Sequence, residues 1–333
     1  MSNGFTWRDA GRTVVCADGA LGDATETLAR NGVEQFELFS TDRALGEAPG
    51  LKAAARRVHR VPPGNVSDLA GGLLAEVGEG PLVALGGGRV IDVAKALAAV
   101  RGAEVAAIPT TMSGAEMTAS HRVAGGGGKR AEAGVRPRLV IADPRVMTSA
   151  PEPELRASSM NALAHGADTL YLPLSNPVSE MTALRGAAEV AGALDQDRAG
   201  RDNVALALGS LLCGYAIDSA GMGLHHLVCQ SLVRYCGTPH AGTNAAILPH
   251  VVALLAERAP GPYEDFAAAI ETDVAGLSVR IEELGRPRRL SELGGDASEL
   301  DEAIEAMLRR PELQRVPRPP TRDELKALVK RAW

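Results

Sequence analysis

The sequence predicts an α/β domain with a mostly parallel, Rossmann-like sheet, followed by an all-helical domain. In the first half, short apolar or β-branched runs alternate with helical patterns at the spacing of βαβ units. From residue 151 onward the chain shows Ala- and Leu-rich helical periodicity and almost no strand pattern. Its 333 residues also exceed the usual size of one domain, about 100–200 residues. We therefore expect two domains, at residues 1–150 and 151–333.

The expected strands of the first domain are short, and the run PLVAL is typical of a buried strand. They cover residues 12–16, 35–41, 81–85, 104–108 and 138–141. Helical patterns cover residues 21–31, 66–77 and 90–100. Four consecutive glycines at residues 125–128 cannot hold regular structure at low cost, which predicts a mobile loop or a hairpin turn.

The second domain is delimited by helix signals at both ends. Pro151, Pro153 and Glu154 indicate a helix start, with proline in the first turn and an acid at the positive end of the helix dipole. Near the end of the chain, the segment RVPRPP at residues 315–320 predicts an extended break before a final amphipathic helix at residues 322–333.

Composition and charge narrow the class of protein. Hydrophobic residues make up 45% and charged residues 23%, which is typical of a globular chain. The net charge of −6 speaks against a surface built for nucleic acid or anionic lipid. Four cysteines are too few for a disulfide framework, and the chain starts with no signal-peptide pattern. The longest nearly apolar stretch, residues 204–217, is too short to span a bilayer, so we expect a cytoplasmic protein.

A triple-glycine turn follows the expected strand at residues 81–85, in the run LVALGGGRVIDVAKAL. Glycines at a strand-to-helix junction allow positive φ and let backbone N–H groups face a ligand. The helix N-terminus adds partial positive charge, which suits a pyrophosphate. The alternative is a tight turn without a ligand, with Asp92 capping the first helical turn.

Two further groups of polar residues carry functional signals. The run AIPTTMSGAEMT at residues 107–118 places hydroxyls at the carboxyl end of a strand, where α/β sheets bind ligands. Asn161 and His165 are four residues apart and lie on one face of the expected helix. His226 and His240 follow, the latter within GTPHAGTNAAILPHV. Any one of these histidines taken alone is more typical of a hydrogen-bonded core residue than of a functional group.

Taken together, four motifs resemble the iron-containing alcohol dehydrogenase superfamily, which shares the dehydroquinate synthase-like fold. They are GGGRVIDVAK, IPTTMSGAEMT, SSMNALAHGADTLY and the stretch from His226 to PHAGTNAAILPHV, in the family's order. Within the superfamily the sequence is most similar to maleylacetate reductases, enzymes of aromatic compound catabolism. The resemblance implies a dinucleotide-binding α/β domain, a helical catalytic domain, and hydride transfer from a nicotinamide to a carbonyl in a cleft between them. It also leads us to expect a homodimer.

The resemblance assigns the cofactor residues. Gly86, Gly87 and Gly88 would hold the pyrophosphate with support from Asp92. Thr110, Thr111 and Ser113 would line the adenosine and nicotinamide path, and Lys129 would lie against the nicotinamide ribose. Asp42 would accept the adenosine ribose hydroxyls, which favours NAD(H) over NADP(H); a helix cap is the alternative role of an acid after a strand. The set is Asp42, Gly86, Gly87, Gly88, Asp92, Thr110, Thr111, Ser113 and Lys129.

The family's metal site uses one Asp and three His, and the matching positions here hold Asn161, His165, His226 and His240. Three neutral imidazoles bind Zn²⁺ or Fe²⁺, but a neutral amide is a poor fourth ligand. Maleylacetate reductases, which work without a bound metal, also have Asn at that point and the PHA triplet. The resemblance therefore implies a site without metal.

Two positions depart from the family pattern and leave the substrate open. Gln230 stands where the family commonly has a histidine four residues after His226. Asn244 stands where maleylacetate reductases tend to carry a second histidine after PHA.

For catalysis we expect His165, His226 and His240 to stabilise the oxyanion and donate the proton, with Asn161 orienting one of them. A dicarboxylate substrate needs cationic partners, and the candidates are Arg122, with the adjacent His121, and Arg234; surface arginines are the alternative. His59 and His250 are expected to be structural or exposed, and His225, adjacent to His226, is expected to be a packing neighbour.

Three functions remain open at this point. The first is a metal-independent NAD(P)H-linked reductase of a small oxo-acid. The second is an alcohol or aldehyde dehydrogenase that binds Zn²⁺ or Fe²⁺ through His165, His226 and His240. The third is an inactive relative that binds nucleotide.

Overall fold

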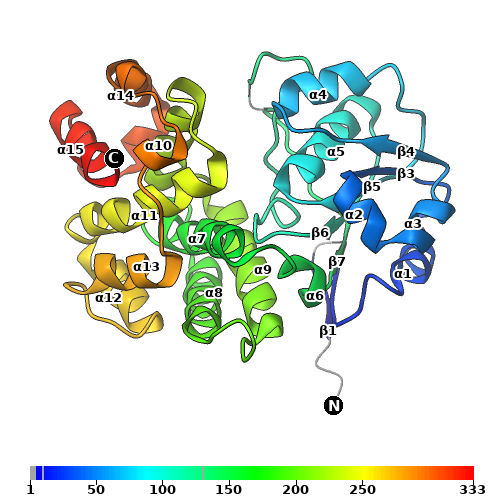
Figure 1. Cartoon of the computed structure of the whole chain (residues 1–333), viewed down its shortest axis with the longest axis horizontal. Helices are drawn as coiled ribbons and strands as arrows, with labels where there is room; N and C mark the ends of the chain where they lie inside the picture. Colours follow the sequence, from blue (N-terminus) through cyan, green and yellow to red (C-terminus); the bar gives the residue numbers. More distant parts are fainter. Residues whose placement is uncertain (1–4, 10, 130) are drawn as a thin grey trace. The chain divides into compact units, whose positions relative to one another are not determined.

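The computed structural model describes residues 5–9, 11–129 and 131–333, with side chains from Gly11 onward. It divides into two compact units, Met1–Ala150 and Pro151–Trp333. The first is an α/β unit and the second is all-helical (Figure 1), so the predicted fold class is confirmed.

The first unit is built on a seven-stranded sheet in the order β1-β2-β7-β6-β5-β3-β4. Only the β1–β2 pair is antiparallel, and all other pairs are parallel. The strands are β1 (Phe5–Asp9), β2 (Arg12–Cys16), β3 (Glu37–Ser40), β4 (Arg57–Arg60), β5 (Leu82–Gly86), β6 (Val105–Pro109) and β7 (Leu139–Ala142). Strands β1 and β4 are additional to the five predicted. Strand β4 has the sequence RVHR, and charged residues on an edge strand hide it from a hydrophobicity pattern.

Alternate residues of the central strands enter two separate cores. Val83 and Leu85 of β5 pack on one face of the sheet, among residues of α1 (Ala24–Arg30), α2 (Asp42–Glu47) and α3 (Pro49–Ala54). Leu82 and Ala84 pack on the other, against α4 (Val66–Leu73) and α5 (Gly88–Arg101) (Figure 1). Both faces are therefore covered, which explains why these strands are almost wholly apolar. A short helix, α6 (Pro144–Met147), ends the unit.

The four glycines at residues 125–128 form a turn rather than an extended loop. The Val123 amide donates to the Lys129 carbonyl across it at 2.8 Å. Gly125, Gly127 and Gly128 have positive φ. The Gly125 amide also donates to the Ser67 carbonyl at 2.8 Å, which ties the turn to α4.

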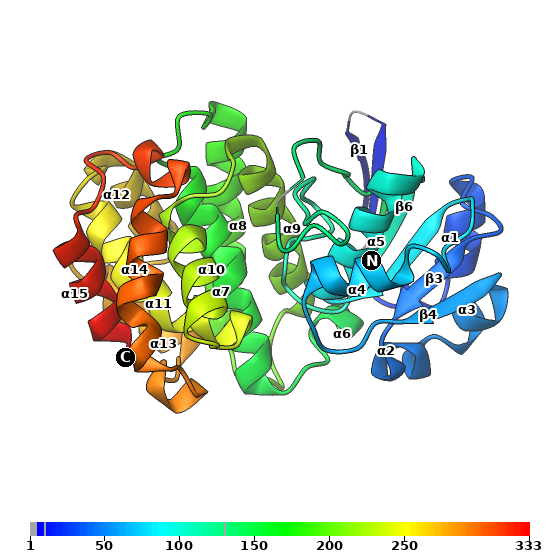
Figure 2. The same cartoon turned by 90° about the horizontal axis from the view of Figure 1, so that it is seen from above.

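The second unit has helices throughout residues 151–333 and no strand. Helices α7, α8 and α9 pack side by side (Figure 2). The final helix begins at a capping box of Thr321 and Glu324, directly after the predicted break. The α-helices are α7 (Glu152–Thr169), α8 (Pro177–Asp195), α9 (Asn203–Ala220), α10 (Leu224–Tyr235), α11 (His240–Ala256), α12 (Pro260–Ala269), α13 (Leu277–Gly285), α14 (Leu300–Leu308) and α15 (Arg322–Ala332). Short 3-10 turns lie at Ser291–Leu293, Ala297–Glu299 and Pro311–Arg315.

Helix α9 is long and apolar enough to cross a membrane by length and composition alone. More than half of it is buried inside the unit, and it packs on α7 and α8. A core helix of a globular unit has these properties.

Helices α8 and α9 approach one another through facing glycines. A Cβ on Gly209 would lie 2.7 Å from the Gly186 carbonyl oxygen and 2.8 Å from Val190 Cγ2. Gly192, also on α8, has open space around it.

We expect Gly209→Ala to lower the free energy of unfolding by about 1–3 kcal/mol, because the added methyl group overpacks the contact. Gly192→Ala makes the same chemical change on an open face and should raise the free energy of unfolding by up to about 1 kcal/mol. Urea unfolding followed by circular dichroism measures both. Equal stability of the two variants would show that the helices are not held this close.

Candidate active site

The triple-glycine turn joins β5 to α5 and is constrained by close contacts. A Cβ on Gly86 would lie 2.6 Å from Val90 Cγ2. On Gly87 and Gly88 it would lie 3.1 Å from the side chains of Thr111 and Ser113. None of the three glycines has positive φ, so our expectation of left-handed backbone here was wrong. Glycine is needed because the turn passes against Val90 and the polar segment that follows β6.

A cavity of about 280 Å³ opens beside this turn within the first unit. Four of the predicted cofactor residues, Gly87, Gly88, Thr110 and Thr111, line it. Arg43 and Arg89, which the sequence analysis missed, add positive charge to the lining. The other lining residues are Thr41, Ala44, Glu47, Val90, Val146 and Ser149. A helix N-terminus and two guanidinium groups make this cavity suited to phosphate.

Asp92 lies in α5 and does not cap it, because Gly87 occupies the cap position. Its Oδ1 instead accepts a hydrogen bond from Lys95 Nζ at 2.9 Å. Lys95 is wholly buried and also donates to the Ala115 carbonyl at 3.1 Å. Asp92 therefore supports the turn through Lys95, which ties α5 to the segment containing Ser113.

Two other expected cofactor residues lie on the surface. Asp42 is the first residue of α2, where Thr41 provides the cap, so the cap alternative for Asp42 was wrong. The Asp42 carboxylate is exposed and accepts from Arg60 Nε at 2.5 Å. Lys129 is exposed at the end of the glycine-rich turn.

In the second unit, three helices bring the expected histidines together. The rings of His165 on α7 and His226 on α10 stack at 4.8 Å with an interplanar angle of 8°. His240 is the exposed first residue of α11, and its Nδ1 lies 3.7 Å from Cys229 Sγ. Asn161 lies one turn before His165 on α7, and its Oδ1 accepts from Asn244 Nδ2 at 2.9 Å.

Burial and mutual repulsion determine the charge of this cluster. Burial lowers the pKa of His165 well below its ordinary value, and the neighbouring His226, His225 and His240 lower it further. Burial likewise lowers the pKa of His225 to about 3. His165 and His225 are therefore neutral at pH 7.

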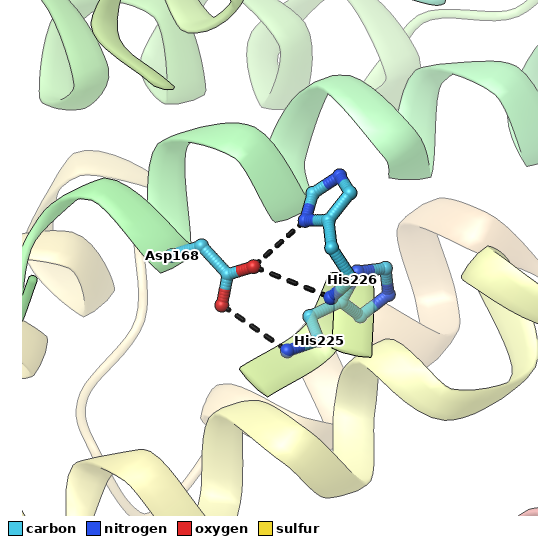
Figure 3. Close-up of side chains that lie close together, drawn as sticks. All are labelled: Asp168, His225 and His226. Atoms are coloured by element: carbon cyan, nitrogen blue, oxygen red, sulfur yellow. Dashed lines mark hydrogen bonds and ion pairs between the residues drawn. The ribbon is translucent and has the colours of Figure 1, made fainter. Parts of the chain in front are cut away.

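Asp168 is a buried member of the site that the sequence analysis missed. Its Oδ2 lies 2.7 Å from His226 Nδ1, and its carboxylate accepts hydrogen bonds from backbone amides at the start of α10 (Figure 3). Its position three residues after His165, on one face of α7, was the available signal. Asp168, His225 and His226 are also close enough together to hold a metal ion.

The three histidines for which we predicted no catalytic or substrate-binding role have the following surroundings. His59 Nε2 is 2.7 Å from Glu37 Oε2, and its ring stacks on Phe39. His225 Nε2 donates to the Asn244 carbonyl at 3.0 Å. His250 is half-buried on α11.

The candidate cations for a carboxylate substrate lie in different places. Arg122 is in the first unit and donates to the Gly128 carbonyl at 3.0 Å, while His121 Nδ1 donates to the Arg122 carbonyl at 2.9 Å. Arg234 is exposed near the Tyr235 ring. Arg310, which the sequence analysis missed, donates to Gln230 Oε1 at 3.1 Å, one turn of α10 beyond His226.

Glu116 is a second buried acid, beside Lys95 in the first unit. Burial raises its pKa to about 7, against the opposing effect of the Lys95 ammonium. Between pH 4.5 and 7 the unfolded chain therefore binds fewer protons at this residue than the folded chain does, and stability falls as pH rises.

We expect Glu116→Gln to remove this loss of stability, which amounts to about 3 kcal/mol across the interval. The difference in unfolding free energy between the variant and the wild type should therefore grow from pH 4.5 to 7 and then stay constant. Urea titrations at several pH values measure it, with the exposed Glu132→Gln as a control of equal charge change. A parallel pH profile for the Glu116 variant and the wild type would contradict an acid held neutral by burial.

Comparison with known proteins agrees with this architecture. Two family models cover nearly the whole chain: "Iron-containing alcohol dehydrogenase" matches residues 12–151, and "Fe-containing alcohol dehydrogenase family, C-terminal" matches residues 156–333.

Individual relatives point to one group within this family. Maleylacetate reductase 1 of Rhodococcus opacus is 34% identical, over 81% of this chain and 78% of the relative. Maleylacetate reductase of a Rhizobium strain is 30% identical, over 99% of this chain and 97% of the relative. The crystal structure of maleylacetate reductase from Agrobacterium tumefaciens superposes with a TM-score of 0.84 at 28% identity, covering 100% of this chain and 99% of the other. The chain therefore belongs to the iron-containing alcohol dehydrogenase family and is an NAD(P)H-dependent oxidoreductase similar to the maleylacetate reductases.

Proposed function

We propose that the protein is an NADH-dependent, metal-independent reductase of a small oxo-acid, of the maleylacetate reductase type. The observation that carries the proposal is the cluster of His165, His226 and His240, in which an amide, Asn161, stands at the family's acidic ligand position and accepts from Asn244. The relatives named maleylacetate reductase support the substrate class.

In this proposal NADH supplies the hydride and an imidazolium supplies the proton. Hydride delivered to a carbonyl carbon, or to a double bond conjugated with it, leaves negative charge on oxygen. A hydrogen-bond donor must then stabilise that oxygen and protonate it. His226 and His240 are assigned this task because His165 stays neutral at pH 7. NAD⁺, the reduced acid and a neutral imidazole result, and solvent returns the proton to the imidazole.

The cofactor and substrate assignments follow from the same reasoning. The pyrophosphate is assigned to the cavity beside Gly87 and Gly88. NADH is favoured over NADPH because the exposed Asp42 carboxylate would repel a 2′-phosphate. Arg122 and Arg234 remain the proposed partners of a substrate carboxylate. A cytoplasmic homodimer is the proposed working form.

A direct test measures NADH and NADPH oxidation with maleylacetate, other oxo-acids and simple aldehydes. Turnover of an oxo-acid with NADH supports the proposal. Preference for simple aldehydes would contradict the substrate class. Nucleotide binding without any turnover would identify an inactive relative.

His240→Ala should lower kcat by about 10²- to 10⁴-fold, the usual contribution of a general acid. The Kd for NADH, measured by fluorescence titration, should change little because His240 belongs to the substrate half of the site. His250→Ala is the matched control on the same helix, and we expect near-normal turnover from it. Near-normal kcat in the His240 variant would remove it from the proton-donating set.

A metal-dependent alcohol or aldehyde dehydrogenase is the second candidate, and one observation favours it. A histidine that binds a metal usually donates its other ring N–H to a carboxylate, and Asp168 Oδ2 lies 2.7 Å from His226 Nδ1. His165, His226 and His240 would hold Zn²⁺ or Fe²⁺, which would polarise the substrate oxygen. The fit of this site to a metal ion is incomplete, because the fourth position, Asn161, supplies only a neutral oxygen that already accepts a hydrogen bond from Asn244.

We expect protein purified without chelator to carry less than stoichiometric zinc or iron. Its oxo-acid reductase activity should survive dialysis against EDTA, because an imidazolium rather than a metal stabilises the oxyanion. Elemental analysis and activity before and after dialysis decide the question. One bound metal per chain, with activity lost on dialysis and restored by Zn²⁺ or Fe²⁺, would select the second candidate.

A further inference from the structure

The Asp168 carboxylate is wholly buried and lies at the N-terminus of α10. Its Oδ2 accepts from the backbone amides of Gly223 at 3.2 Å and His226 at 3.4 Å. Its Oδ1 accepts from the amide of His225 at 3.2 Å and from the Tyr171 hydroxyl at 3.4 Å. Both oxygens therefore face N–H or O–H donors.

The shortest of these contacts is made by a side chain. His226 Nδ1 lies 2.7 Å from Asp168 Oδ2 (Figure 3). Three backbone amides converge on the same carboxylate, which favours its ionised, acceptor-only form. The ring nitrogen that faces it must then carry the proton. This interaction fixes the His226 proton on Nδ1.

The chain is built to allow this approach. A Cβ on Gly223 would lie 2.6 Å from Asp168 Cγ, so a side chain at that position would separate α10 from the carboxylate. The Tyr171 hydroxyl accepts from the Leu224 amide at 2.6 Å and holds the same helix start from a second side. Asp168 thus contacts both α10 and the ring that α10 carries.

We propose that Asp168 is a positioning residue that holds His226 as the Nδ1–H tautomer, with Nε2 as the ring atom that exchanges the proton with the substrate oxygen. The tautomer is a property of the free protein. The proton transfer through Nε2 rests on the proposed reductase function.

The first experiment is NMR of the wild-type protein labelled with ¹⁵N-histidine, at a pH where the His226 ring is neutral. We expect a slowly exchanging ring proton bonded to His226 Nδ1, assigned by its loss in His226→Gln. A His226 ring protonated on Nε2 instead would overturn the proposal. This measurement needs no Asp168 variant and no substrate.

The second experiment uses Asp168→Asn, which keeps the size of the side chain. In the wild type both carboxylate oxygens accept from N–H donors. Whichever way the substituted amide is oriented, its NH₂ group faces one of these donors, so the interactions that hold His226 and the start of α10 should weaken. We expect kcat to fall by at least about tenfold with KM for NADH unchanged, as when the orienting acid of a catalytic histidine is replaced. The Nδ1–H signal should shift or be lost by exchange.

Tyr171→Phe is the matched control. It removes a second support of the α10 start but leaves the Asp168–His226 bond in place. We expect a lower Tm, an unchanged Nδ1–H signal and kcat within about twofold of wild type. Equal losses of kcat in both variants, in proportion to their losses of Tm, would show a purely structural Asp168 and overturn the proposal. If no substrate is turned over, the reductase proposal fails, and the wild-type NMR spectrum still decides the role of Asp168.

Discussion

The site in the helical unit depends on one buried negative charge. Burial raises the pKa of Asp168, and the hydrogen bonds from the backbone amides of His225, His226 and Gly223 oppose this effect. An ionised carboxylate with no access to water is tolerated only when donors surround it. The start of α10 supplies these donors, so the position of that helix, the orientation of His226 and its stacking on His165 all follow from this single group.

In the first unit, the triple-glycine turn is constrained by close packing rather than by a buried charge. Gly86, Gly87 and Gly88 have ordinary backbone angles, yet each stands where a methyl group would contact Val90, Thr111 or Ser113. Lys95 links α5 to the polar segment that follows β6, because its Nζ donates hydrogen bonds to Asp92 Oδ1 and to the Ala115 carbonyl. The cavity beside Gly87 and Gly88 is therefore lined by backbone whose position is constrained.

Periodicity and motifs in the sequence predicted most strands and helices and several site residues. Contacts between residues that are distant in sequence could not be predicted in this way. The apolar strands and the helix carrying Asn161 and His165 were predictable, because burial on both sheet faces or on one helix face leaves a regular pattern. Strand β4 was missed because its edge position permits charged residues. Arg43 lies far in sequence from the glycines that line the same cavity, and Arg310 lies far in sequence from Gln230, so only the fold shows these pairs. Asp168 was visible in the helical spacing, but its partners on α10 were not.

Two of the departures from the family pattern, Asn161 and Asn244, meet in space. Asn161 and Asn244 are 83 positions apart in sequence, yet their side chains share one hydrogen bond at 2.9 Å. An acid at the first position or a histidine at the second would place an ionisable group where two neutral amides now meet. Gln230, the third departure, accepts from Arg310, which is itself paired with Glu312. A histidinium at that position would face a guanidinium, whereas an amide oxygen accepts from it. Three neutral amides therefore stand at these positions, in two separate hydrogen-bonded groups, and none of them is a group that donates a proton at neutral pH. The proton chemistry that we propose for the site accordingly falls on the imidazoles.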